Sequence, residues 1–160
     1  MENQILICPF DEKLLTKLRQ EALIVETNDE NILPYIASVA GHDNQLHAIR
    51  LNADKPLSAI SFQEEWQSVP LIIVAPEFGS YKELANKIPL LQRMNVKVFL
   101  KPGNDFSYTA LKILSSLHIS CGVWLPGSAL NWEEMNDLMH YACYAKTNHA
   151  DIEPFRYIVS

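Results

Sequence analysis

Side chains that could do chemistry follow the apolar runs of this sequence. Glu77 comes directly after "PLIIVAP" at 70–76, and Lys101 lies near the end of "VKVFLKP" at 96–102. If the runs are parallel strands, their ends share one rim, where a carboxylate and an ammonium group could bind an anion or do acid–base work. With His149, they are our candidate catalytic residues. The alternative is that all three are solvated loop residues or helix caps. Other side chains at the same rim are Asn104, Asp105, Trp124 and Ser128.

A second group of residues has the types found in metal sites. His140 and Cys143 are three positions apart in a helical pattern, and His149 follows shortly after them. With Asp151 or Glu153 they could complete a site with nitrogen, sulfur and oxygen ligands. The alternative is that Cys143 is a small core residue beside the apolar stripe of the same helix. The sequence contains neither C-x-x-C nor H-E-x-x-H, which are the stronger zinc signatures.

The elements that would position these residues alternate between two periodicities. Several apolar runs lack alternation and are rich in β-branched residues, which is typical of parallel strands covered on both faces. The runs lie at 4–8, 23–27, 46–51, 70–76, 96–102 and 119–126. Helical spacing occurs between them, at 14–22, 32–40, 81–91, 106–117 and 135–142. Pro89 should kink or break the helix predicted at 81–91.

The alternation predicts an α/β fold of about six βα units with a parallel sheet. We expect a partial (βα)₆ barrel, and the alternative is an open doubly wound sheet. The two sheet edges, predicted at 4–8 and within 119–126, would need a cover or would pair with a partner or a second copy. The 160 residues fit one domain, in which residues 146–160 form a tail that packs back on the fold.

Composition excludes several classes of function. A net charge of −6 with scattered Lys and Arg disfavours nucleic-acid binding. No apolar segment is long enough to span a membrane. The three cysteines, Cys8, Cys121 and Cys143, lie in apolar surroundings, which favours reduced thiols in a cytoplasmic protein. G-x-G-x-x-G and the P-loop do not occur, which argues against a nucleotide site, and the missing G-x-S-x-G elbow argues against an α/β hydrolase. We expect no cofactor.

Three longer stretches resemble a known family. "VPLIIVAPEFGSYKELANKIPLLQRMNVKVFLKP" and "FSYTALKILSSLHISCGVWLP" are similar to βα units of the radical-SAM partial barrel. The closing "NWEEMNDLMHYACYAKTNHADIEPF" resembles the tail of pseudo-radical-SAM proteins, which accompany radical-SAM enzymes that modify ribosomally made peptides. The resemblance covers about residues 70–155.

The chain departs from the catalytic members of that family at the cluster motif. Those enzymes hold a [4Fe–4S] cluster through C-x-x-x-C-x-x-C, whereas the cysteines here are scattered along the chain. The resemblance therefore implies a relative that has no iron–sulfur cluster and does no radical chemistry.

These observations give three hypotheses about function. The first is a non-catalytic binding or accessory protein of a peptide-modification system, with a peptide or protein partner. The second is a small-molecule enzyme with its site at the carboxyl ends of the strands, using Glu77, Lys101 and His149. The third is a structural domain stabilised by a metal at His140, Cys143 and His149.

Overall fold

The computed structural model describes residues 6–13, 23–43, 46–103, 106–126, 130–144, 150 and 152–153. Within these ranges the six predicted apolar runs are all strands, and a seventh, short strand follows near the end of the chain. The strands are β1 (Leu6–Pro9), β2 (Leu23–Thr27), β3 (Leu46–Asn52), β4 (Leu71–Ala75), β5 (Val96–Leu100), β6 (Ser120–Val123) and β7 (Ile152–Glu153).

The helices lie between the strands, as the sequence predicts. They are α2 (Leu33–Asp43), α3 (Tyr81–Leu84), α4 (Ile88–Arg93), α5 (Phe106–Ser116) and α6 (Trp132–Tyr144). Short 3₁₀ helices occur at η1 (Glu30–Ile32), η2 (Leu57–Ala59), η3 (Glu64–Ser68) and η4 (Ala85–Lys87). Pro89 breaks its helical pattern as predicted: η4 separates α3 from α4, and Pro89 lies in the first turn of α4. The helix predicted at 14–22 lies outside the described residues.

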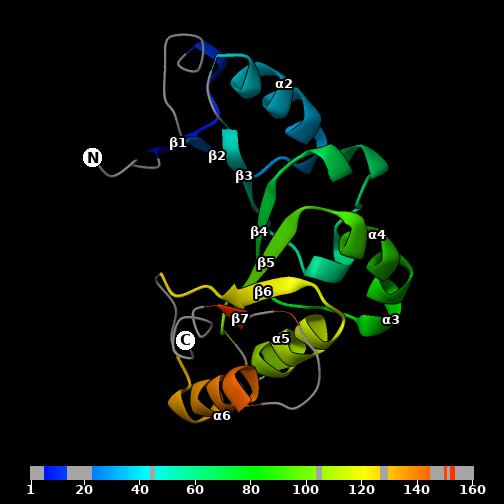
Figure 1. Ribbon diagram of the computed structural model, residues 1–160, viewed down its shortest axis with the longest axis vertical. Helices are drawn as coiled ribbons and strands as arrows, with labels where there is room; N and C mark the ends of the chain where they lie inside the picture. The colour runs from blue at the N-terminus through cyan, green and yellow to red at the C-terminus, as the bar shows by residue number, and fades with distance from the viewer. Residues whose placement is uncertain are drawn as a thin grey trace.

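The described strands form one parallel, seven-stranded sheet in the order β1-β2-β3-β4-β5-β6-β7. Each strand pairs with its neighbours in sequence, so the order contains no reversal of the kind that a doubly wound sheet requires. The sheet is not closed, and the arrangement is an open α/β sheet or partial barrel. Figure 1 shows the described helices placed around one side of the strands.

The main core lies between the sheet and these helices. Alternate strand residues point to the helix side, where Val25, Ile49, Ile73 and Val98 are each 0% exposed. Helix residues that pack against them include Leu33, Ile36, Leu84, Leu111, Leu114 and Leu138. The opposite face, which we call the open face, carries the remaining strand residues. Figure 1 shows no described helix over it, but some of its strand residues are buried, among them Val74 at 2% and Ala48 at 5% exposed. The expectation that both faces of the strands are covered stays a prediction.

The tail closes one edge of the sheet. Cys121 and Gly122 of β6 pair with Ile152 and Glu153 of β7. The prediction that β6 is an edge strand is therefore wrong. Ile152 is 1% exposed, and the Ala150 N–H donates to the Ser115 carbonyl at 2.9 Å. Ala150 and β7 therefore contact the rest of the fold, while the packing of residues 146–160 as a whole stays a prediction, because most of them lie outside the described residues. No helix in the described ranges is long and apolar enough to cross a membrane.

Candidate functional site

The predicted rim residues follow neighbouring strands, β4 and β5. Glu77 and Lys101 both have exposed side chains. Their backbones are ordered by hydrogen bonds, since the Glu77 carbonyl accepts the Leu57 N–H at 2.9 Å and the Lys101 N–H donates to the Ala75 carbonyl at 3.1 Å. The third candidate, His149, lies outside the described residues. Joint action of the three in catalysis stays a prediction.

Of the predicted metal ligands, too, only some lie within the described residues. His140 is exposed on α6, and Cys143 is half-buried one turn later. In the described ranges no three His, Cys, Asp or Glu side chains gather in a way that could hold a metal ion. Because His149 and Asp151 lie outside those ranges, the predicted site itself is not tested.

Charged residues gather instead on the open face, in the middle of the strands. The register places Glu26 of β2 beside Arg50 of β3, and Arg50 beside Ile72 of β4. Ile72 in turn lies beside Lys97 of β5, which lies beside Ser120 of β6. One row of side chains therefore crosses five strands, and two cations in this row flank an isoleucine.

The centre of this face is a group of four residues, Glu26, Arg50, Phe99 and Trp124, which we call the Arg50 cluster. Arg50 forms an ion pair with Glu26, and its guanidinium carbon lies 5.0 Å from the centroid of the Trp124 ring. Trp124 also meets Phe99 edge to face, with ring centroids 5.8 Å apart and planes at 71°. Desolvation by burial lowers the pKa of Arg50. Even so, a guanidinium stays protonated in a protein, so the cluster holds a fixed positive charge against an aromatic ring.

Local structure explains how Trp124 comes to this position. Its N–H donates to the Leu100 carbonyl at 2.9 Å, which continues the direction of β6 by one residue past Val123. Gly122 lies two residues earlier on the same face, where a Cβ would come within 2.8 Å of the Phe99 ring. The missing side chain at Gly122 therefore leaves room for the Phe99 ring, which in turn packs against the Trp124 ring.

A second ion pair lies toward the last strand. The Lys97 ammonium donates to a Glu153 carboxylate oxygen at 2.7 Å, with the side chains 31% and 19% exposed. This pair joins β5 to β7 across β6, because Gly122 of β6 presents no side chain between them. The two carboxylates, Glu26 and Glu153, thus hold the two cations of the open face from opposite sides.

A hollow of about 450 Å³ opens at the carboxyl ends of β1, β2 and β3, next to the Arg50 cluster. Its lining includes Phe10, Glu26, Thr27, Asn28, Asp29 and Asn52. The loop after β2 is ordered, because the Asp29 carboxylate accepts the Asn31 N–H at 2.9 Å and caps η1. Glu26 belongs to both the hollow and the Arg50 cluster, so the two form one continuous surface.

Sequence reasoning named Trp124 as a rim residue but missed Glu26, Arg50 and Lys97. The signal was present, because each of these is a charged residue inside an apolar strand. A strand covered by apolar elements on both faces rarely holds an unpaired charge. Such residues therefore indicate that one face of the sheet is partly solvated and that charges from different strands meet there.

The thiols differ in their surroundings, and this gives a testable prediction. Burial raises the pKa of Cys121 to about 12 and also raises the pKa of Cys8, whereas Cys143 is only half-buried. Since the thiolate is the reactive form, a thiol reagent at pH 8 should modify Cys143 first and Cys121 only after unfolding. Peptide mass mapping during labelling measures the order. Equal rates at Cys121 and Cys143 in the folded protein would contradict the burial described above.

No protein-family model, curated protein or solved structure matches this chain.

Proposed function

We propose that this chain is a non-catalytic binding protein that holds a peptide or protein partner on the open face of its sheet. The observation that carries the proposal is the Arg50 cluster. Arginine and tryptophan are the residue types most enriched among those that dominate binding energy at protein interfaces. Here a half-buried arginine lies over a half-buried tryptophan on a sheet face that the described helices leave uncovered.

The pairing of charges supports binding. The Arg50 guanidinium faces the Glu26 carboxylate, and the Lys97 ammonium faces the Glu153 carboxylate. Ion pairs of this kind orient rigid donors and hold long side chains in one conformation, which lowers the entropy lost when a partner binds. The proposal therefore assigns these four residues to recognition.

Partner binding at the face is favoured over pairing at the edge strand β1. The Phe10 N–H donates to the Glu26 carbonyl of β2 at 2.9 Å. In a parallel strand, the backbone N–H and C=O groups of successive residues point alternately to the two neighbouring strands. Since Phe10 bonds to β2, the backbone groups of Pro9 point to the free edge, and proline has no N–H that could donate there. Proline at such a position is a common way to protect a sheet edge. An added strand would find a gap in its ladder at this residue.

The proposed setting is a system that modifies ribosomally made peptides. It is supported by the resemblance of residues 70–155 to pseudo-radical-SAM proteins, in a chain that lacks the C-x-x-x-C-x-x-C motif. In this setting the partner is a precursor peptide or the radical-SAM enzyme that acts on it.

The experiment uses the full chain and two tryptophan variants. The products of the adjacent genes are labelled, and their affinity for the chain is measured by fluorescence anisotropy. Trp124→Ala should weaken binding at least about tenfold, because a buried aromatic anchor is lost. The matched control is Trp132→Ala on α6, whose side chain is 72% exposed and lies away from the Arg50 cluster.

Two further measurements make the result decisive. Circular dichroism and a denaturant titration establish that Trp124→Ala is folded, and Arg50→Gln tests the same cluster with a smaller change in volume. Equal affinities for the Trp124→Ala and Trp132→Ala variants would contradict binding at the open face. The absence of a peptide-modification enzyme among the adjacent genes would contradict the setting.

A further inference from the structure

A second hollow, of about 310 Å³, opens at the amino ends of β3, β4, β5 and β6, whereas the first lies at the carboxyl ends of β1, β2 and β3. Its polar lining comes from His47, Asn95, Lys97 and Ser120, and its apolar lining includes Ile72 and Val96. A volume near 300 Å³ is at the lower end of the range for small-ligand pockets.

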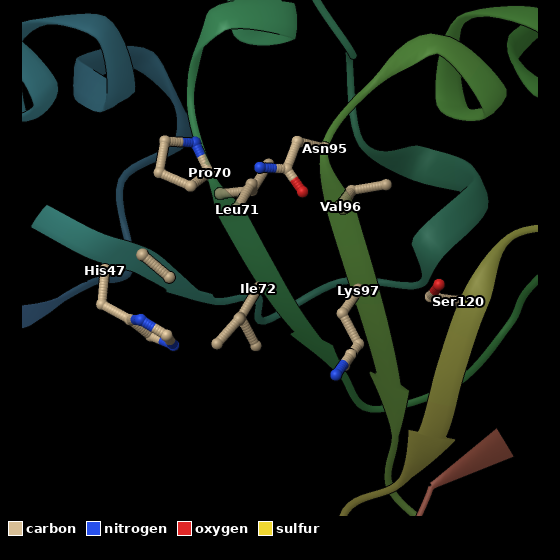
Figure 2. A pocket seen from close by; sticks show the side chains of 9 residues that line it. His47, Pro70, Leu71, Ile72, Asn95, Val96, Lys97 and Ser120 are labelled. Atoms are coloured by element: carbon tan, nitrogen blue, oxygen red, sulfur yellow. The ribbon is translucent and has the colours of Figure 1, made fainter. Parts of the chain in front are cut away.

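The side chains that line this hollow come from different strands, and His47, Ile72 and Lys97 lie on one side of the sheet (Figure 2). Figure 2 shows His47 and Lys97 extending in the same direction, with Ile72 between them. The register explains the arrangement, because Ile72 pairs with Lys97 and Lys97 pairs with Ser120. Neighbouring strands are about 4.8 Å apart, so these residues stand in consecutive steps across the floor of the hollow.

The polar lining can donate hydrogen bonds from several directions. An ammonium group has three donors, and the bond from Lys97 to Glu153 at 2.7 Å uses one of them. Ser120 carries a hydroxyl donor, and Asn95 carries an amide donor. His47 is exposed and can donate from a ring nitrogen. Donors from several strands around one hollow, with a cation among them, are suited to an anionic ligand.

Glu153 limits the charge of that anion. Its carboxylate lies 2.7 Å from the ammonium of Lys97, so it partly neutralises the cation and repels a second negative charge. A dianionic phosphate would therefore be disfavoured relative to a carboxylate, which has one charge and two oxygens. Ile72 lies beside Lys97 and gives the hollow an apolar floor, so we expect the ligand to carry an apolar body beside its charge.

We propose that this hollow binds a carboxylate group carried on a small apolar body. Two sources have this chemistry: a free short-chain carboxylic acid, and the carboxyl terminus of a polypeptide whose last side chain is apolar. Lys97 and Glu153 also form one of the ion pairs that the proposed function assigns to recognition. The carboxylate site does not use Glu26, Arg50 or Trp124, so the Trp124→Ala test of partner binding does not test it.

The probes test separately the charge of the ligand, its shape and the source of its carboxylate. Full-length protein labelled with ¹⁵N is titrated with 3-methylbutanoate, with its uncharged amide, and with inorganic phosphate. A further pair is an acetylated tripeptide ending in leucine, with a free or an amidated carboxyl terminus. We expect saturable shifts of the amide resonances of β4, β5 and β6 with the acid, at an affinity of about millimolar because the ligand is small.

Matched lysine variants provide the main control. Lys97→Gln should weaken carboxylate binding at least about tenfold, because the charge-assisted bond is lost. Lys82→Gln, at an exposed lysine of α3, should leave the affinity unchanged. Since Lys97→Gln also removes the partner of Glu153, the double variant Lys97→Gln/Glu153→Gln restores a neutral pair and should bind as weakly as the single variant.

Each outcome supports or overturns the assignment. Binding of the free acid alone, or of the tripeptide acid as well, supports the site and identifies the source of the carboxylate. Binding of the amide as tightly as the acid overturns it, and so does phosphate binding that equals carboxylate binding. The assignment also fails if Lys97→Gln is folded and keeps the affinity of the unmodified protein. These results do not depend on the Trp124→Ala experiment, so failure here and failure of partner binding are distinguishable.

Discussion

Replacing Gly79 with alanine should destabilise the fold by about 3 kcal/mol or more, which corresponds to a decrease in melting temperature of about 6–12 °C for a domain of this size. Gly79 has a φ of +86°, where an L side chain is strained. A Cβ at this residue would lie 2.1 Å from the Ser58 hydroxyl oxygen and 2.7 Å from the Pro56 Cβ. Neither the strained φ nor the steric overlap can relax easily, because Pro56 and Ser58 are held in the loop around η2.

This contact matters because Ser58 organises the loop after β4. Its hydroxyl accepts the Ser80 N–H at 2.9 Å, and its N–H donates to the Phe78 carbonyl at 3.1 Å. The Ser58 carbonyl also accepts a hydrogen bond from the Lys87 ammonium at 2.6 Å. A side chain at Gly79 would therefore separate the loop that carries Glu77 from η2, and would disturb the start of α3.

The matched control for Gly79→Ala is Gly103→Ala. A Cβ at Gly103 would meet no atom within 4 Å. That variant should change stability by less than about 1 kcal/mol, and its reduced freedom in the unfolded state favours a small gain. Gly79→Asn separates the two causes, because asparagine tolerates positive φ but keeps the Cβ. Thermal and urea unfolding measure all three variants, and equal stability of Gly79→Ala and Gly103→Ala would refute the prediction.

Replacing Gly122 with alanine should cost about 2 kcal/mol and should also disturb the open face. A Cβ at Gly122 would lie 2.8 Å from the Phe99 ring, 3.0 Å from the Glu153 Cβ and 3.0 Å from the Glu153 carbonyl oxygen. The ring can rotate away, but the backbone of β7 must shift. We therefore expect weaker pairing of β7 with β6, and displacement of Phe99 from the edge of Trp124.

A double-mutant cycle isolates the contact with the ring. Phe99→Leu removes the aromatic edge, so Gly122→Ala should cost less in that background, with a coupling of about 0.5–1 kcal/mol. Urea unfolding measures the free energies, and the near-ultraviolet circular dichroism of the aromatic side chains reports the displacement. Additive effects of the two changes would show that Phe99 is not the obstacle.

The strands could be predicted from the sequence because burial on the helix side fixes their composition. "LIVET" at 23–27 and "VKVFL" at 96–100 are strands with these bounds. Pro89 ends one helical pattern because its ring and missing N–H act locally. Asn131 is also a local signal, since its side-chain oxygen accepts the Glu134 N–H at 3.1 Å at the start of α6. Such features depend only on residues close together in the chain.

The candidate site could not be predicted in the same way. Glu26, Arg50 and Trp124 are far apart in the sequence, and a charge inside an apolar strand does not indicate which residues of other strands it meets. They meet only because the strand order and the register bring β2, β3 and the end of β6 to one surface. The short strand β7 is a similar case, since two residues carry no periodicity and become a strand only by pairing with β6.

The sequence by itself therefore determined the class of fold, the positions of the elements and the absence of several known motifs, since all of these are written in local composition and spacing. The tertiary structure alone decided which face of the sheet stays open, which charges are paired there, and which glycines have no room for a side chain. These features depend on distances between residues of different strands, and a single sequence contains no record of such distances.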